Sequence, residues 1–150
     1  MKNFYYLIIL SFFSAAIFSC ENKGLVNDFR INNYLQEEFS TREFENKSAI
    51  FHLNAEGCES CVLQILAFFL NNEEMVLNAK MQLIIAGIPS EENIKILIDR
   101  LSVTYIADRE NKLRNYYQGY FNGVIIDLEN GEHINIVNYQ DFEENINILF

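Results

Sequence analysis

Two cysteines three positions apart carry the most specific chemistry in the sequence. Cys58 and Cys61 form a C-x-x-C pair, and two thiols with this spacing at a helix start can close and reopen a small-ring disulfide. The exposed amide groups of a helix N-terminus favour a thiolate at Cys58. Cys61 follows one turn later, where it can resolve a mixed disulfide between Cys58 and a substrate. The pair therefore predicts thiol–disulfide exchange, with Cys58 as the nucleophile and Cys61 as the resolving cysteine.

Acidic residues flank the first cysteine. Glu56 and Glu59 lie within two positions of Cys58. A carboxylate near a thiolate disfavours it, and a less stable thiolate means a less stable reduced state. We therefore expect a couple that is more reducing than a strongly oxidising C-x-x-C pair, which favours a reductase over an oxidase.

The first twenty residues have the pattern of an exported lipoprotein. Residues 1–19 contain one positive residue, Lys2, then an apolar stretch with small residues near its end, as in a secretory signal peptide; an uncleaved anchor helix is the alternative. Residues 17–20, Ile-Phe-Ser-Cys, resemble the lipobox of bacterial lipoproteins. That resemblance implies cleavage before Cys20, a diacylglycerol thioether on its sulfur and usually a fatty acid such as palmitate on the new N-terminus. The protein would then be lipid-anchored in the cell envelope, on the periplasmic or outer face of a bacterial membrane.

The number of cysteines agrees with export. The chain has three cysteines, so a lipid on Cys20 leaves Cys58 and Cys61 in the mature protein. Outside the cytoplasm the environment is oxidising. A C-x-x-C pair there is either a disulfide or a redox couple.

The composition predicts one folded domain with an appendage. The chain has 150 residues, half of them hydrophobic, which is enough for a core of its own. Its formal net charge is −10 and it has no basic run, so it lacks the clustered Lys and Arg that nucleic-acid binding requires. We expect no nucleic-acid partner. We divide the chain into a signal peptide (1–19), a tether with an amphipathic lead-in (20–44) and a domain (45–150).

Within the domain, predicted strands and helices alternate. The predicted strands are residues 49–54, 81–88, 103–106, 123–128 and 133–137. Helices are expected from residue 59 to about 72, after Ser90 and after Asp108 as N-caps, and at the C-terminus, where Asp141 and Glu144 resemble a capping box. The last two strands form a hairpin, in which Asn130 and Gly131 are the preferred pair for a type I′ turn.

This order of elements, with C-x-x-C directly after the first strand, resembles the thioredoxin-like superfamily, particularly its lipid-anchored or periplasmic thiol–disulfide members. The resemblance covers roughly residues 45–150 and implies a three-layer α/β fold with a mixed central sheet and a C-terminal β-hairpin plus helix. It assigns the same roles to Cys58 and Cys61, cycling through a Cys58–Cys61 disulfide without a cofactor. The implied partners are protein thiols and disulfides and an unidentified redox protein.

The resemblance also indicates where a substrate would bind. Family members usually carry a cis-proline just before the hairpin, opposite the cysteines, where it helps to bind the substrate backbone. Here that neighbourhood is residues 120–123, Tyr-Phe-Asn-Gly, and the only proline is Pro89. Phe121 and Asn122 are therefore the candidate substrate-groove residues. Gly57 stands where many members have a tryptophan.

Two other functions stay open. One is a non-catalytic thioredoxin-like binding domain of a lipoprotein, in which the Cys58–Cys61 disulfide is structural. The other is a metal site, although the two histidines, His52 and His133, show no ligand spacing. We expect His52 to be a satisfied core residue and His133, after the hairpin turn, to be solvated. If Cys58 is exposed in a groove, a redox function is favoured. If the sulfurs of Cys58 and Cys61 are both buried under residues 21–48, a structural role is favoured.

Overall fold

The structure is a computed structural model that describes residues 27–117 and 119–150. The predicted signal peptide of residues 1–19 and the predicted lipidation residue, Cys20, lie outside the described residues. Within the part of the chain that is described, no helix combines the length and the apolar character needed to cross a membrane.

A five-stranded mixed sheet forms the middle of the molecule, in the order β3-β2-β1-β4-β5. The strands are β1 (Ala49–Asn54), β2 (Met81–Ala86), β3 (Tyr105–Asp108), β4 (Gly123–Asp127) and β5 (Glu132–Ile136). Strands β1, β2 and β3 run parallel to one another, and β4 and β5 add an antiparallel hairpin beside β1. The carboxyl ends of β1, β2, β3 and β5 therefore meet at one edge of the sheet, where the chain also enters β4.

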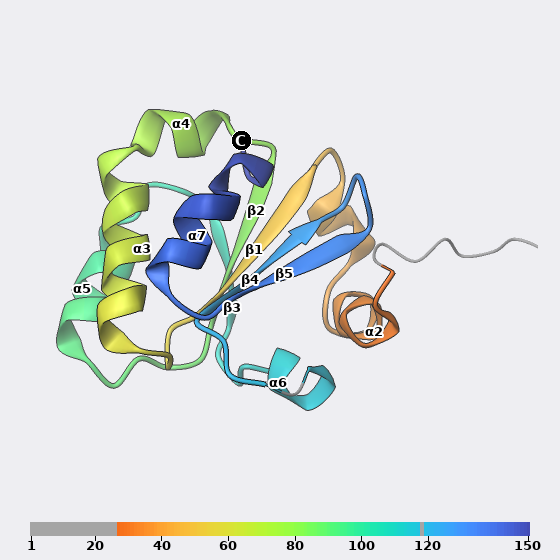
Figure 1. Cartoon of the computed structure of the whole chain (residues 1–150), viewed down its shortest axis with the longest axis horizontal. Coiled ribbons are helices and arrows are strands. Elements are labelled where there is room, and N and C mark those ends of the chain that lie inside the picture. The colour runs from red at the N-terminus through yellow and green to blue at the C-terminus, as the bar shows by residue number, and fades with distance from the viewer. Residues whose placement is uncertain (1–26, 118) are drawn as a thin grey trace, which may run out of the picture.

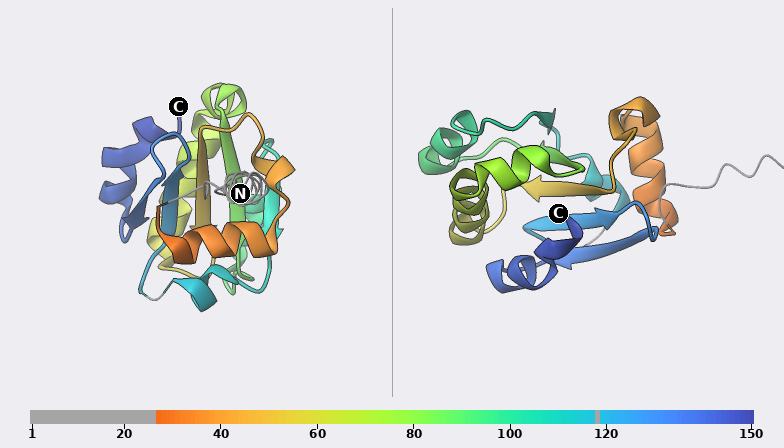
Figure 2. Two further views of the ribbon diagram at one scale, coloured as in Figure 1. Left: turned by 90° about the vertical axis from the view of Figure 1, so that its right-hand side faces the viewer. Right: turned by 90° about the horizontal axis from the view of Figure 1, so that it is seen from above.

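Helices cover both faces of this sheet and complete three layers, as Figure 1 shows. One face carries α3 (Glu59–Asn71), α4 (Glu73–Asn78), α5 (Glu92–Asp99) and α7 (Tyr139–Asn145). The other carries α2 (Phe29–Glu38) and α6 (Leu113–Tyr116), and the left view of Figure 2 shows α2 lying across the strands. Short 3₁₀ turns follow α2 (Thr41–Phe44) and α7 (Ile146–Ile148). The predicted three-layer α/β fold with a mixed sheet and a C-terminal hairpin plus helix is confirmed.

The central strand β1 is buried along its whole length, because it has a neighbour on each side and helices on both faces. Side chains alternate between the faces of a strand. Phe51 and Leu53 therefore join the core under α3 and α7, and Ile50 joins the core under α2. The strand thus belongs to two cores at once and fixes the loop that follows it.

The segment before the domain is partly folded onto it. Ile31, Tyr34 and Leu35 of α2 are fully buried against the second face of the sheet. The sequence places them in the tether and lead-in of residues 20–44. The folded unit of the described chain therefore begins before residue 45.

The hairpin is confirmed, but its predicted type I′ turn is wrong. The loop has four residues, 128–131, and of its residues only Gly131 has a positive φ, +69°. The carboxylate of Asp127 accepts the backbone N–H groups of Glu129 and Asn130 at 2.9 and 3.0 Å, and the N–H of Gly131 donates to the Asp127 carbonyl at 2.9 Å. These bonds stabilise a longer loop that needs one left-handed residue instead of two.

Three predicted helix starts are also corrected. Helix α5 begins at Glu92 without a side-chain cap, because the hydroxyl of Ser90 faces the Glu91 carboxylate at 3.4 Å. The capping box of α7 is formed by Asn138 and Asp141, three residues before the predicted pair. Helix α6 starts only at Leu113, although the Asp108 carboxylate does accept the backbone N–H of Lys112, the residue before that helix, at 2.9 Å. For α5 and α7 the predicted helix is right and the capping residue is wrong, whereas α6 is a single turn that ends at Tyr116 and is shorter than predicted.

Candidate active site

The C-x-x-C pair lies where β1 passes into α3. Cys58 is the N-cap residue of that helix, with an extended backbone at φ −63° and ψ 118°, and Cys61 is in its first turn. Because Gly57 has no side chain, the Asn122 side chain and the Asn54 carbonyl can lie close to the loop before Cys58. A Cβ at position 57 would meet the side-chain oxygen of Asn122 at 2.3 Å and the carbonyl oxygen of Asn54 at 3.0 Å. The predicted position of Cys58 at the helix start is confirmed.

The two thiols differ in their surroundings. Both are free, half-buried and 3.7 Å apart. The Ser60 hydroxyl, 3.3 Å from the Cys58 sulfur, and then the backbone N–H of Cys61 lower the pKa of Cys58 to about 7. Burial, followed by the neighbouring Cys58, raises the pKa of Cys61. The lower pKa of the two is therefore that of Cys58. The roles of Cys58 as nucleophile and Cys61 as resolving cysteine stay predictions. The predicted disulfide between them stays a prediction.

The flanking glutamates do not oppose the thiolate as expected. Glu56 turns away from Cys58, since its carboxylate is 3.0 Å from the Arg114 guanidinium and accepts the backbone N–H of Ile88 at 3.2 Å. Glu59 is exposed to solvent. Close hydrogen bonds stabilise a thiolate more than paired or solvated carboxylates disfavour it. The expectation that Glu56 and Glu59 destabilise the Cys58 thiolate is therefore wrong.

The two groove candidates have different places in the fold. Phe121 is 2% exposed and packs edge-on against His52 and Tyr117, on the α2 side of the sheet. Its ring offers no surface to a substrate. Asn122 is also buried, but its side-chain oxygen accepts the backbone N–H of Cys58 at 2.6 Å. Of the two, Asn122 is the one that belongs to the cysteine site.

The histidines lie apart from the cysteines. His52 is a core residue, as expected, but not a satisfied one: neither ring nitrogen has a hydrogen-bond partner, and Nε2 is 3.9 Å from the Asp108 carboxylate. His133 is half-buried against the Tyr117 ring, with Nε2 4.0 Å from Asp28, so the prediction of a solvated residue is wrong. Within the described residues, no group of three His, Cys, Asp or Glu side chains is placed to hold a metal ion.

A polar network beside the site was not predicted. The Asn54 amide donates to the Phe121 carbonyl at 2.9 Å, and its oxygen accepts from Asn111 at 2.8 Å and from the backbone N–H of Glu56 at 3.2 Å. These bonds tie the loop before Cys58 to the segments before α6 and β4. A sequence signal existed, because Asn54 is a polar residue at the end of an otherwise apolar strand.

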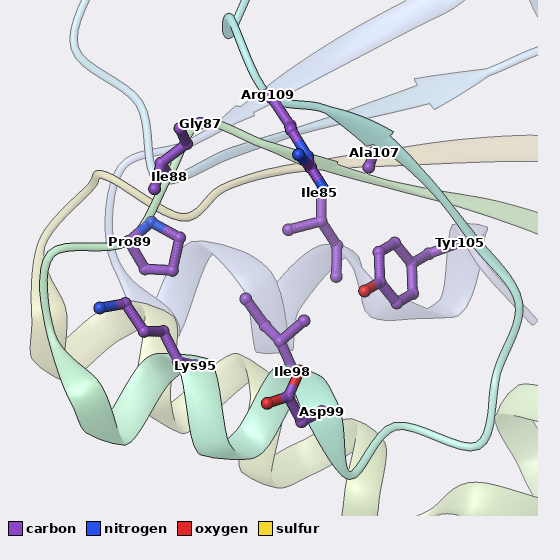
Figure 3. Close-up of a pocket in the computed structure, with 10 residues that line it drawn as sticks. All are labelled: Ile85, Gly87, Ile88, Pro89, Lys95, Ile98, Asp99, Tyr105, Ala107 and Arg109. Carbon is purple, nitrogen blue, oxygen red and sulfur yellow. The ribbon is translucent and has the colours of Figure 1, made fainter.

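A separate hollow of about 320 Å³ lies between α5 and the ends of β2 and β3. Figure 3 shows its apolar side chains, including Ile85, Ile98 and Tyr105, with Arg109 beside them. Neither cysteine lines it. Its rim meets the cysteine loop at Glu56, which accepts the N–H of Ile88 and lies against Gly87. We treat the hollow as a neighbouring feature and not as the reactive site.

The arrangement has the parts that thiol–disulfide exchange requires. One thiol is activated and accessible, and a second, less acidic thiol is held within reach of it. In comparisons with known proteins, no family model, no curated protein and no solved structure matches the chain. The functional proposal below therefore depends on the geometry of the site and on the sequence patterns.

Proposed function

We propose that this protein is an exported thiol–disulfide oxidoreductase of the thioredoxin-like superfamily, acting mainly as a reductase on protein disulfides. The observation that supports it is the asymmetry of the pair: Cys58 has a pKa of about 7 at the start of α3, and the pKa of Cys61 beside it is raised. A thiol whose pKa is close to the ambient pH attacks disulfides most effectively.

The proposed reaction has two exchange steps. The Cys58 thiolate attacks one sulfur of a substrate disulfide, which forms a mixed disulfide and releases the other substrate sulfur as a thiolate. Cys61 then gives up its proton to that thiolate or to water and attacks the Cys58 sulfur, which releases the second substrate thiolate. The substrate disulfide gains two electrons, and the protein is left with a Cys58–Cys61 disulfide. A dithiol partner protein must reduce it again.

The reducing direction is supported by the degree of thiolate stabilisation. The most strongly oxidising C-x-x-C proteins have a nucleophilic cysteine with a pKa near 3.5, whereas the reducing thioredoxins have one near 7. Cys58, at about 7, falls with the second group. Because its thiolate is only moderately stabilised, the reduced form is not strongly favoured and the pair gives up its electrons more readily.

The proposed location is the bacterial cell envelope, on the periplasmic or outer face of a membrane, with a lipid on Cys20 as the anchor. It is supported by the signal-peptide and lipobox patterns of residues 1–20. Fractionation of cells expressing the full chain or Cys20→Ala tests it. We expect the full chain in the membrane fraction, with an N-terminal peptide that begins at Cys20 and has the added mass of a lipid, and we expect Cys20→Ala to lack both the lipid and the cleavage.

A redox titration tests the reaction itself. The full-length protein is equilibrated in buffers of reduced and oxidised glutathione or dithiothreitol, free thiols are trapped, and the mass of the peptides with Cys58 and Cys61 is read. We expect a reversible two-electron couple that disappears in both Cys58→Ser and Cys61→Ser. A Cys58–Cys61 disulfide that resists reduction until the protein unfolds would overturn the proposal and leave the non-catalytic binding domain.

A further inference from the structure

Asn122 lies directly before β4, at the edge of the sheet where the cysteine loop begins, and it is fully buried. Its main chain is used within the sheet: the N–H donates to the Ile136 carbonyl at 2.7 Å, and the carbonyl accepts the N–H of Asn54 at 2.9 Å. Its main chain is thus not available to pair with a substrate. What Asn122 offers the active site is its side chain.

That side chain is held in one orientation. Its Nδ2 donates to the Val137 carbonyl at 2.6 Å, and its Oδ1 accepts the Cys58 N–H at 2.6 Å. A flipped amide would set donor against donor at Cys58 and acceptor against acceptor at Val137. The hydroxyl of Tyr120, on an exposed ring, adds a weaker contact to Oδ1 at 3.3 Å. The amide therefore spans the gap between the hairpin and the C-x-x-C loop.

The loop is shaped to receive this amide. A Cβ at position 57 would lie 2.3 Å from the Asn122 Oδ1 and 3.2 Å from its Cγ, so a residue with a side chain cannot be placed there without displacing the amide. Gly57 and Asn122 thus fit together directly beside the reactive cysteine, although they are far apart in the sequence.

We infer that Asn122 is a positioning residue of the Cys58–Cys61 couple. Its Oδ1 holds the backbone N–H of Cys58, and this fixes the Cys58 sulfur beside the Ser60 hydroxyl and the N–H groups of the first turn of α3. The inference rests on the proposed function for its meaning, because a fixed Cys58 matters for exchange chemistry. The contact itself does not depend on that function.

The chemistry at position 122 calls for a neutral acceptor. A carboxylate there would still accept the Cys58 N–H, but it would place a full negative charge beside the thiolate and disfavour it. An apolar side chain would leave the Cys58 N–H without its partner and the loop free to move. A carboxylate and an apolar side chain therefore have different effects on Cys58: the first raises the pKa of its thiol through charge, and the second removes the hydrogen bond to its N–H.

The test is the pH profile of Cys58 alkylation in the full-length protein, followed by the mass of the peptide that carries Cys58 so that other cysteines do not contribute. We expect Asn122→Asp to move the midpoint upward by about one pH unit, which lowers the rate at pH 7 by about fivefold from a wild-type midpoint near 7. Asn122→Ala should move it in the same direction by less, and should reduce the preference for Cys58 over Cys61. Gly57→Ala, which displaces the amide, should resemble Asn122→Ala and decides the question if the Asn122 variants do not fold.

Two control variants separate positioning from stability and from charge alone. Tyr34→Phe removes a buried side-chain hydrogen bond to Asp108 on the other face of the sheet, and Asn138→Asp adds a charge at the exposed cap of α7, where aspartate caps well. Neither should move the alkylation midpoint. If the Asn122 variants lower the melting temperature like Tyr34→Phe but keep the wild-type midpoint, Asn122 is purely structural and the inference is overturned. Alkylation needs no substrate, and in a Cys61→Ser background Cys58 stays free even if the wild-type disulfide resists reduction. A wild-type protein that fails the redox titration would therefore sink the proposed function and still leave this test decisive.

Discussion

The two faces of the sheet are packed in different ways. Under α3, α5 and α7 the buried core is apolar throughout, with aromatic pairs such as Phe51 and Phe142, whose ring centroids are 5.3 Å apart. Under α2 and α6 the core includes polar groups: the Tyr34 hydroxyl donates to the buried Asp108 carboxylate at 2.9 Å, and His52 lies beside both. One face is insensitive to protonation, and the other contains groups that titrate.

This difference separates the reactive pair from the titratable interior. The helix that Cys58 opens packs on the apolar face. On the other face, burial lowers the pKa of His52 and so disfavours its protonated form. Burial opposes the ionisation of Asp108, but His52 and Tyr34 outweigh it and lower the pKa of that carboxyl. The buried groups Tyr34, His52 and Asp108 therefore lie on the face of the sheet opposite α3.

The largest expected effect is the loss of the reaction on the apolar side. Cys58→Ser should abolish disulfide reduction and should leave the melting temperature of the reduced protein nearly unchanged, because Cys58 is half-buried and is not in the core. Cys61→Ser should instead retain a stable mixed disulfide with substrate. Insulin reduction and non-reducing gels measure both. Full activity in Cys58→Ser would show that the nucleophile is elsewhere.

The largest expected effect on stability also lies on this face. Phe51→Ala removes a fully buried ring that contacts Phe69 and Phe142, and should lower the free energy of unfolding by roughly 3–5 kcal/mol. Phe150→Ala, at a ring that is 43% exposed, is the matched control and should change it by less than about 1 kcal/mol. Urea denaturation measures both variants. Equal losses would mean that the core does not depend on Phe51 as its packing indicates.

The polar face should give the pH dependence. Because the pKa of His52 is lowered in the folded state, the unfolded chain binds more protons below about pH 6.5. Stability should therefore fall as the pH drops below that value, by at most about 1.4 kcal/mol per pH unit for one proton. His52→Phe, which keeps a ring between Tyr34 and Phe121, should flatten the loss between pH 6.5 and 5. Denaturation at several pH values measures this, and an unchanged slope in His52→Phe would place the acid-sensitive group elsewhere.

Local patterns predict the apolar face better than the polar one. The break at Gly57, the run of apolar residues after Cys61 and the hairpin are features of neighbouring residues, so periodicity and turn residues indicate them. Helix caps fail more often, because neighbouring polar residues, such as Asn138 and Asp141 at the start of α7, can each cap the orphan N–H groups and small energies decide between them.

The contacts that define the site's chemistry are out of reach of such patterns. Asn122 meets the Cys58 N–H from 64 positions away, and Tyr34 meets Asp108 from 74 positions away. Nothing in the spacing of the residues along the chain predicts which side chains form these long-range hydrogen bonds. The same holds for Glu56, whose effect depends on the direction of its carboxylate and not on its distance along the chain from Cys58.

The smallest expected effect tests that last point. Glu56→Gln removes the charge that pairs with Arg114 but keeps an oxygen for the N–H of Ile88. Because the pair is largely exposed, the free energy of unfolding should change by roughly 1 kcal/mol or less. The midpoint of Cys58 alkylation should stay near pH 7, since Ser60 and the N–H of Cys61 stabilise the thiolate and Glu56 points away from it. A midpoint that falls clearly in Glu56→Gln would show that Glu56 does act on the cysteine, as sequence proximity alone predicts, and Arg114→Gln should then raise it.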